Sequence, residues 1–354
     1  MKKKIKLILL SICFPLGLMA QELINSQFYL NRVNTNPAFV GETNIRLNIN
    51  SRSQWMHIPS KLGSNFMSGN LVVDGPICSR PNSGIGGRVG YEIHGQSGLQ
   101  TMSIYGAFAQ KIPMSKFLNL RLGIEGGFLN RSLNGNQLIY SDQIDPIRGV
   151  VSTSSNSGLP LLSVFTANFN AGAILSYKHN KRSSPLKRLY FGISAHNLNT
   201  PQLNLISSNS DERLARRYTI HGTALFDNRW PVAMICNVRY MQLENLGTNV
   251  FDIFVNGVKQ SQNRRQGASF TIGGGFRTAN SSLRRNTHSA LAAFGFTWEE
   301  NSQILVSTDI NVGGFSTGSF STWEISLIWN FDNACNKGRG RRSSSGGYLG
   351  CADF

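Results

Sequence analysis

Apolar and polar residues alternate along most of this chain. In the segment 165–177 every odd-numbered position is apolar or aromatic, and in the segment 45–50 isoleucine and leucine alternate with arginine and asparagine. A period of two is typical of β-strands that bury one face, whereas the 3.6-residue spacing of helices is nearly absent. The pattern therefore predicts an all-β protein, although a soluble sandwich would alternate in the same way.

Strand length and number favour a transmembrane barrel. Most of the alternating segments reach the ~9–11 residues that a tilted strand needs to cross a bilayer. We predict about fourteen antiparallel strands, and an even number places both ends of an outer-membrane barrel on the periplasmic side. The predicted strands are 45–55, 64–74, 84–94, 99–112, 117–131, 164–179, 187–197, 214–227, 230–243, 246–257, 267–277, 288–299, 302–312 and 319–331.

The connections between these strands are unequal in length. In the predicted topology the two longest, 132–163 and 198–213, both lie at the outer end, and the periplasmic connections are short. Transmembrane barrels show this asymmetry, and a soluble sandwich has no reason to show it.

The last predicted strand carries a row of large apolar side chains on one face. They alternate with polar residues such as Glu324 and Ser326, as expected for a lipid face with an aromatic girdle. A central strand of a soluble domain is the less favoured alternative. The outward row consists of Trp323, Ile325, Leu327, Trp329 and Phe331.

The chain begins with a secretory signal. Three lysines precede an apolar run from position 5 to 19, and Ala20 supplies a small residue before the predicted cut. A lipoprotein site at Cys13 is disfavoured because the bulky Ile12 precedes that cysteine. We therefore expect an integral outer-membrane protein divided into a signal peptide (1–20), an N-terminal segment (21–44), a barrel (45–331) and a tail (332–354).

The mature chain is strongly basic. Removal of the four lysines of the signal lowers the net charge from +17 to +13. Lipopolysaccharide, acidic sugars or an acidic protein fit this charge better than nucleic acid, because the chain is exported and its arginines are scattered. Four arginines are expected to face the lumen or rim, either in a solvated, mutually hydrogen-bonded interior, which we favour, or as a site for an acidic plug. They are Arg46, Arg121, Arg131 and Arg239.

Four cysteines remain after the cut. Cys335 and Cys351 flank a stretch rich in glycine, serine and arginine, and they are the candidate disulfide pair in an oxidising compartment. The tail that contains them cannot build a core, so we expect it to be flexible and periplasmic.

The sequence offers little for catalysis. Its six histidines lack metal-binding spacing, and no nucleophile elbow occurs. Asp142 and Asp145 in an outer connection and His196 near another are the candidates for a hydrolytic site, but aspartates before bends are ordinary turn residues. We expect no enzyme activity, no cofactor and no metal.

The segment 27–41 predicts an ordered turn. Asn36-Pro37 disfavours helix at Asn36, and Gly41 allows the chain to reverse into the first strand. The segment resembles the N-terminal signature of the PorP/SprF family, outer-membrane proteins of the type IX secretion system of Bacteroidetes. The residues that carry the resemblance are Asn36, Pro37, Ala38, Phe39 and Gly41, followed by Arg52, Gln54 and Trp55 at the end of the first strand.

Other stretches resemble the family in the same order. Ser141–Asp145 is similar to an F-x-D-Q-I-D stretch, 191–201 to a G-x-x-x-x-H-L-x-x-P element, and Trp323–Leu327 to the closing strand. The departures are the basic tail and Phe294–Trp298, which stands where the family commonly has Tyr-Ser-Tyr-Asp.

The resemblance implies a non-enzymatic component of type IX secretion. Members of this family look like proteins that bind periplasmic ring proteins and lipoproteins. Alternatively, they look like proteins that bind secreted proteins with a C-terminal sorting domain, including gliding adhesins. The segment 21–44 would then be periplasmic or tucked into the barrel, and the residues named above would bind partners or fix its path. The alternative is a channel for small solutes, which an open polar lumen would favour; a filled lumen would favour protein binding.

Overall fold

The computed structural model describes residues 24–54, 66–94, 98–135, 138–145, 147–151, 160–179, 184–205, 213–226, 232–244, 247–260, 268–281, 284–298, 301–313 and 322–331. Among these residues no helix is long and apolar enough to span a membrane.

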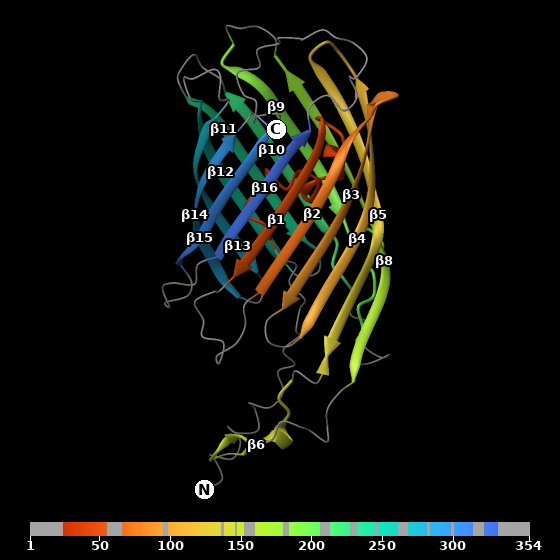
Figure 1. Cartoon of the computed structure of the whole chain (residues 1–354), viewed down its shortest axis with the longest axis vertical. Coiled ribbons are helices and arrows are strands. Elements are labelled where there is room, and N and C mark those ends of the chain that lie inside the picture. Colours follow the sequence, from red (N-terminus) through yellow and green to blue (C-terminus); the bar gives the residue numbers. More distant parts are fainter. Residues whose placement is uncertain are drawn as a thin grey trace.

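Fourteen of the described strands form one closed antiparallel barrel (Figure 1). Strand β1 closes on β16, with Ile45 opposite Phe331 and Gln54 opposite Thr322. The strands are β1 (Ile45–Gln54), β2 (Phe66–Ile77), β3 (Arg80–His94), β4 (Leu99–Pro113), β5 (Leu118–Asn134), β8 (Leu161–Lys178), β9 (Leu186–His196), β10 (Arg217–Phe226), β11 (Val232–Leu243), β12 (Thr248–Gln260), β13 (Ser269–Ser281), β14 (Arg284–Trp298), β15 (Ser302–Gly313) and β16 (Thr322–Phe331).

The barrel confirms the predicted fold class and strand number. Each predicted segment contains one strand, and the ends differ by a few residues. The alternation of apolar and polar residues also corresponds, as expected, to side chains that point outward and inward. In β16 the side chains of Trp323 and Ile325 point outward and are about two-fifths exposed, whereas Glu324 and Ser326 point inward and are buried.

The end of the barrel that is predicted to lie outside the cell carries a small separate hairpin. It lies between β5 and β8 and consists of β6 (Ile144–Asp145) and β7 (Gly149–Val150), preceded by the short helix η5 (Ser141–Gln143). Figure 1 shows β6 well beyond the end of the barrel strands. The strands β6 and β7 and the helix η5 are not predicted by the sequence pattern, which treats this region as a connection.

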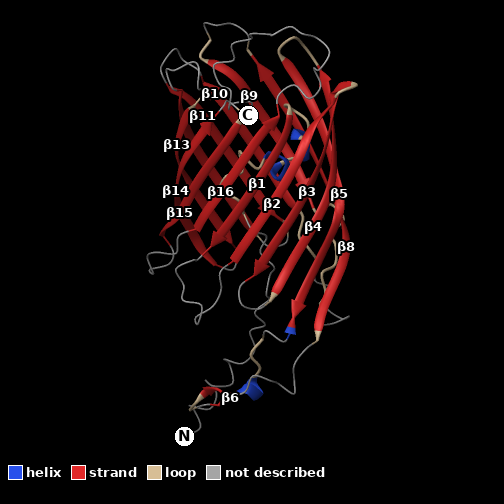
Figure 2. Cartoon of the chain, viewed as in Figure 1, coloured by secondary structure: helices blue, strands red, loops and turns tan. Residues whose placement is uncertain are grey.

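The N-terminal segment also contains regular structure that the pattern does not predict. Two short helices, α2 (Arg32–Thr35) and η1 (Pro37–Phe39), precede β1. Figure 2 draws both within the ring of strands.

A charge placed on the outward face should destabilise the protein in lipid. Ile124 lies near the middle of β5 and is 64% exposed, so Ile124→Arg would hold a guanidinium near the bilayer midplane. We expect a loss of about 2–4 kcal/mol in the free energy of unfolding from lipid vesicles. Ile144→Arg is the control, because Ile144 is similarly exposed on the outer hairpin; equal losses for both variants would contradict the lipid-facing assignment.

Candidate functional site

Residues 24–41, here called the plug, fill the lumen of the barrel. All of them are buried except Ile24 and Asn34, which are half-buried. Two apolar clusters join the plug to the wall. In the first, Tyr29 stacks on Phe254 of β12 with ring centroids 5.1 Å apart, and in the second, Phe39 packs edge-on against Tyr190 of β9.

The Asn36-Pro37 sequence sets the path of the plug. Asn36 is extended, with φ −156°, because the following proline disfavours helical geometry at this position. Pro37 then begins η1, where its missing N–H costs nothing. The Asn36 side chain caps this helix by accepting from the Ala38 N–H at 2.9 Å.

The Asn36 amide also binds the barrel wall. Its Nδ2 donates to the carbonyl oxygens of Ala173 at 3.1 Å and Ile193 at 2.9 Å, and it lies 3.1 Å from His221 Nε2. Asn36 is fully buried, and its contacts reach β8, β9 and β10. One side chain therefore fixes the turn and holds it to three strands.

Glycines on the wall allow the motif to approach the strand backbones. A Cβ at Gly172 would clash with the Asn36 side chain, and a Cβ at Gly123 would clash with the backbone of Ala38. Gly41 has φ +66°, and a Cβ there would clash with the backbone of Gly84. These positions require glycine for close contact, in addition to the bending that barrel closure demands.

Arginines of the wall bind main-chain carbonyls of the plug. Arg121 Nε donates to Ala38 O at 2.9 Å and its Nη2 to Val40 O, while Arg46 Nη2 donates to Leu30 O at 2.5 Å. These bonds satisfy carbonyl groups that water would otherwise solvate.

Neither interpretation of the lumen arginines from the sequence fits this arrangement fully. Arg46 and Arg121 bind main-chain carbonyls and not carboxylates of the plug, and the charged residue of the plug is Arg32, so the segment that occupies the lumen is not acidic. Arg239 binds the first residues of the plug, as described next, and Arg131 lines a cavity above it.

The start of the plug meets a cluster of buried ions contributed by six strands. Three arginines and three carboxylates form ion pairs with N–O distances of 2.5–3.1 Å, so their charges balance. Paired, hydrogen-bonded charges are the form in which ions are tolerated inside a protein. The ion cluster consists of Arg52, Arg239, Asp252, Arg277, Asp309 and Glu324.

Ser26 and Asn25 attach the plug to this ion cluster. The Ser26 N–H donates to Glu324 Oε2 at 2.6 Å, and its hydroxyl donates to Asp309 Oδ2 at 2.5 Å. Arg239 Nη2 donates to Asn25 O at 2.9 Å. The cluster thus binds main-chain and hydroxyl groups of the plug and not a countercharge.

Two other residues singled out from the sequence, Arg52 and Gln54, lie at the end of β1. Arg52 belongs to the ion cluster, and Gln54 can accept from it at 3.1 Å when its amide oxygen faces the guanidinium. Trp55 lies outside the described residues, so its role stays a prediction.

The cysteines show one unexpected feature. Cys78, between β2 and β3, is disulfide-bonded, and Cys236 is a free thiol. The partner of Cys78 is therefore none of the described cysteines. Cys335 and Cys351 also lie outside the described residues, and their pairing with each other stays a prediction.

The structure does not assemble the catalytic candidates. Asp145 accepts hydrogen bonds from the N–H groups of Arg148 and Ile147, which lower the pKa of its carboxyl group, as turn chemistry predicts. His196 lies in the lumen, with Nε2 3.2 Å from Thr35 O of the plug. In the described part of the chain no histidine, cysteine or carboxylate group is arranged to hold a metal ion.

These features define an integral outer-membrane β-barrel whose lumen is occupied by its own N-terminal segment. The chain belongs to the type IX secretion system membrane protein PorP/SprF family, whose sequence model matches residues 18–329. No curated protein matches the chain.

Several solved outer-membrane barrels are similar in fold. The CymD monoaromatic hydrocarbon channel is 10% identical with a TM-score of 0.46, covering 90% of this chain and 96% of that one. The toluene transporter TodX of Pseudomonas putida is 8% identical with a TM-score of 0.45, covering 88% and 94%. A FadL homologue of Pseudomonas aeruginosa is 9% identical with a TM-score of 0.45, covering 84% and 93%.

Gly172→Ala should loosen the plug. The new Cβ would clash with the buried Asn36 side chain and break its hydrogen bonds, so we expect a loss of about 1–3 kcal/mol in the free energy of unfolding and faster trypsin cleavage after Arg32. Gly106→Ala is the matched control, because a Cβ at Gly106 has no neighbour within 4 Å. Equal protease protection of Arg32 in the two variants would show that the close contact at Gly172 is unimportant.

Cys78 should be found oxidised and Cys236 reduced in the mature protein. Peptide mapping without reduction, after alkylation of free thiols, identifies both states and the partner of Cys78. Because a cysteine forms one disulfide, a bond from Cys78 to Cys335 or Cys351 would exclude the pairing of those two. Alkylation of Cys78 without prior reduction would contradict the bond seen here.

Proposed function

We propose that this protein is a non-conducting outer-membrane component of the type IX secretion system that binds other proteins. Family membership supports the secretion role. The observation that favours protein binding over solute transport is the occupied lumen, in which the plug is held by buried ion pairs and hydrogen bonds.

A barrel of this size would otherwise be wide. Eight strands leave an interior that side chains alone can fill, and 16–18 strands leave an aqueous channel. A fourteen-strand barrel lies close to the second case, so the plug supplies the atoms that the wall side chains cannot. A permanently seated plug of this kind is incompatible with diffusion of solutes through the centre.

The proposed partners are periplasmic components of the secretion system, or secreted proteins with a C-terminal sorting domain that are exported or held at the surface, including adhesins of gliding motility. They would meet the ends of the barrel and not its interior. At the outer end the hairpin formed by β6 and β7 exposes Ile144, Ile147 and Val150, each more than half accessible. Clustered apolar side chains above the membrane are a feature of protein-binding surfaces.

Electrical recording tests the closed lumen. The mature protein in a planar bilayer should show little conductance, and deletion of residues 24–41 should raise it strongly. Heat-modifiable migration on gels checks that the deleted protein still forms a barrel, and Gly106→Ala serves as the folded control. Steady large conductance of the unaltered protein would overturn the proposal in favour of a channel.

Gentle extraction of the tagged protein from outer membranes tests partner binding. We expect periplasmic secretion components or a sorting-domain protein to co-purify. A barrel that is recovered alone, from cells that are actively secreting, would contradict the protein-binding role even if the lumen proves closed.

A further inference from the structure

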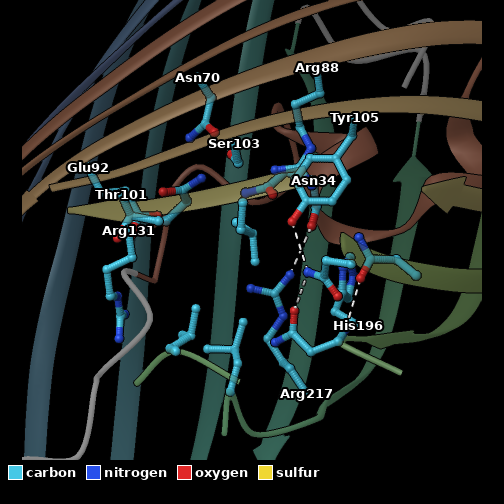
Figure 3. A pocket seen from close by; sticks show the side chains of 17 residues that line it. Asn34, Asn70, Arg88, Glu92, Thr101, Ser103, Tyr105, Arg131, His196 and Arg217 are labelled. Atoms are coloured by element: carbon cyan, nitrogen blue, oxygen red, sulfur yellow. Dashed lines mark hydrogen bonds between the residues drawn. The ribbon is translucent and has the colours of Figure 1, made fainter. Parts of the chain in front are cut away.

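A polar cavity lies in the outer half of the lumen, above the plug. Its empty space, including the open mouth, is about 820 Å³, so only a small molecule or one end of a larger one can enter. Asn25 and Asn34 of the plug contribute to its lining, together with residues from the outer ends of β3, β4, β5, β9 and β10. Figure 3 shows Asn34, Arg88, His196 and Arg217 converging on this space. Because the plug forms the floor of the cavity, an occupant that enters from outside must leave the same way.

One wall of this cavity is fixed by a strained turn after β9. Apart from glycines, Asn197 and Thr200 are the two described residues with positive φ, at +59° and +42°. Such a backbone is uncommon for asparagine and an outlier for a β-branched residue, and it persists only where the surroundings fix it. Asn197 lines the cavity and donates its N–H to Asn170 Oδ1 at 2.8 Å and its Nδ2 to Ala215 O at 2.9 Å. Its Oδ1 accepts from Asn168 Nδ2 at 2.8 Å. The lining is therefore preformed, as it is in small-molecule sites.

Several buried polar atoms of the lining have no hydrogen-bond partner among the described residues. They include a donor, Nδ2 of Asn25, an acceptor, Oδ1 of Asn168, and the hydroxyl group of Thr101. Asn25 is 6% exposed and Asn168 is 1% exposed. Buried donors and acceptors are costly when unsatisfied. An occupant that both donates and accepts hydrogen bonds would complete them, whereas an apolar molecule or a simple anion would not.

The lining also carries an excess of positive charge. Its charged side chains are three arginines, Arg88, Arg131 and Arg217, and one carboxylate, Glu92. The charge of Arg88 is balanced from behind, because its guanidinium forms hydrogen bonds of 3.0 and 2.9 Å with the two carboxylate oxygens of Glu125. The two other arginines outnumber the single carboxylate, so a carboxylate on the occupant would balance the charge of the lining and accept charge-assisted hydrogen bonds.

Hydroxyl groups on the occupant suit the rest of the lining. Each hydroxyl group is both a donor and an acceptor, as the unpartnered amide and hydroxyl atoms require. Amide and hydroxyl side chains are the commonest in the lining, and its aliphatic members are three leucines. A peptide would therefore find few contacts for apolar side chains, whereas a sugar ring presents hydroxyl groups in several directions.

We propose that the outer cavity is a binding site for an acidic sugar, a hydroxyl-rich ring that carries one carboxylate. The sugar enters from the cell exterior, either as a free molecule or as the end of a longer surface glycan. Arg131 and Arg217 bind its carboxylate, and Asn25, Thr101 and Asn168 bind its hydroxyl groups. This inference goes beyond the proposed secretion role and uses the plug only as the floor of the site.

Calorimetric titration of the mature protein in detergent tests the class of ligand. Glucuronate has the hydroxyl groups and the carboxylate, glucose lacks the carboxylate, and cyclohexanecarboxylate keeps the ring and the carboxylate but lacks the hydroxyl groups. We expect glucuronate to bind at least about tenfold more tightly than either analogue, since each analogue leaves buried polar or charged groups unpaired. No binding of glucuronate, whether or not a short acidic peptide binds in its place, would overturn the proposal, and so would equal binding of cyclohexanecarboxylate.

A glucuronate-terminated oligosaccharide distinguishes the two sources of the sugar. Tighter binding of the oligosaccharide than of free glucuronate would support a surface glycan as the ligand. Equal binding would support a free sugar, because the cavity would then contact only the terminal ring.

A pair of threonine variants separates ligand binding from folding. Thr101→Val removes a hydroxyl group that has no partner in the described part of the chain, so Tm should stay the same or rise while glucuronate binds about threefold to tenfold more weakly. Thr271→Val is the matched control, because its buried hydroxyl group also lacks a partner among the described residues but does not line the cavity. Equal affinity of the two variants for glucuronate would contradict the proposal.

The charge of the site is tested by Arg131→Gln. This variant should bind glucose as before and lose the preference for glucuronate over glucose; an unchanged preference would contradict the assigned carboxylate site. Low conductance of a protein that binds no sugar would leave the closed-lumen function intact, so the two proposals can fail separately.

Discussion

The structure depends on one constraint: a fourteen-strand barrel encloses more polar space than its own side chains can fill. The inward face of the strands carries arginine, asparagine and carboxylate side chains, which must find partners once water is excluded. The plug provides these partners chiefly as main-chain groups. Carbonyl oxygens of Leu30 and Ala38 accept from wall arginines, and the N–H of Ser26 donates to a wall carboxylate. A segment with one charged residue can therefore fill a highly charged lumen.

Charge balance within the wall makes this arrangement stable. The ion cluster pairs three guanidinium groups with three carboxylates before the plug is considered, so the plug need not supply a countercharge. Removing one member would leave a buried charge without compensation, which typically costs several kcal/mol.

The fold could be predicted from the sequence because strand alternation is a local signal. The outward rows, the inward position of Arg121 and Arg239, and the long outer connections all follow from periodicity and spacing. The plug contacts could not be predicted in the same way. The hydrogen bond from Arg121 to the carbonyl of Ala38 joins residues far apart in the chain. Because every residue has a main-chain carbonyl, the residue type at position 38 does not reveal this contact. Gly123 and Gly172 are similarly ambiguous, since glycine within a strand serves bending and close contact alike.

The ion cluster lies across the seam where β1 meets β16, and this has a consequence for biogenesis. Ser26 bonds to Glu324, 298 positions later in the chain, while Arg52 of β1 bonds to the same carboxylate of β16. Contacts of such sequence separation form slowly, because the entropy of closing the loop must be overcome first. The portion of the mature protein that leaves the ribosome first is therefore among the last to reach its final place, and must be kept soluble and unpaired until the final strand arrives.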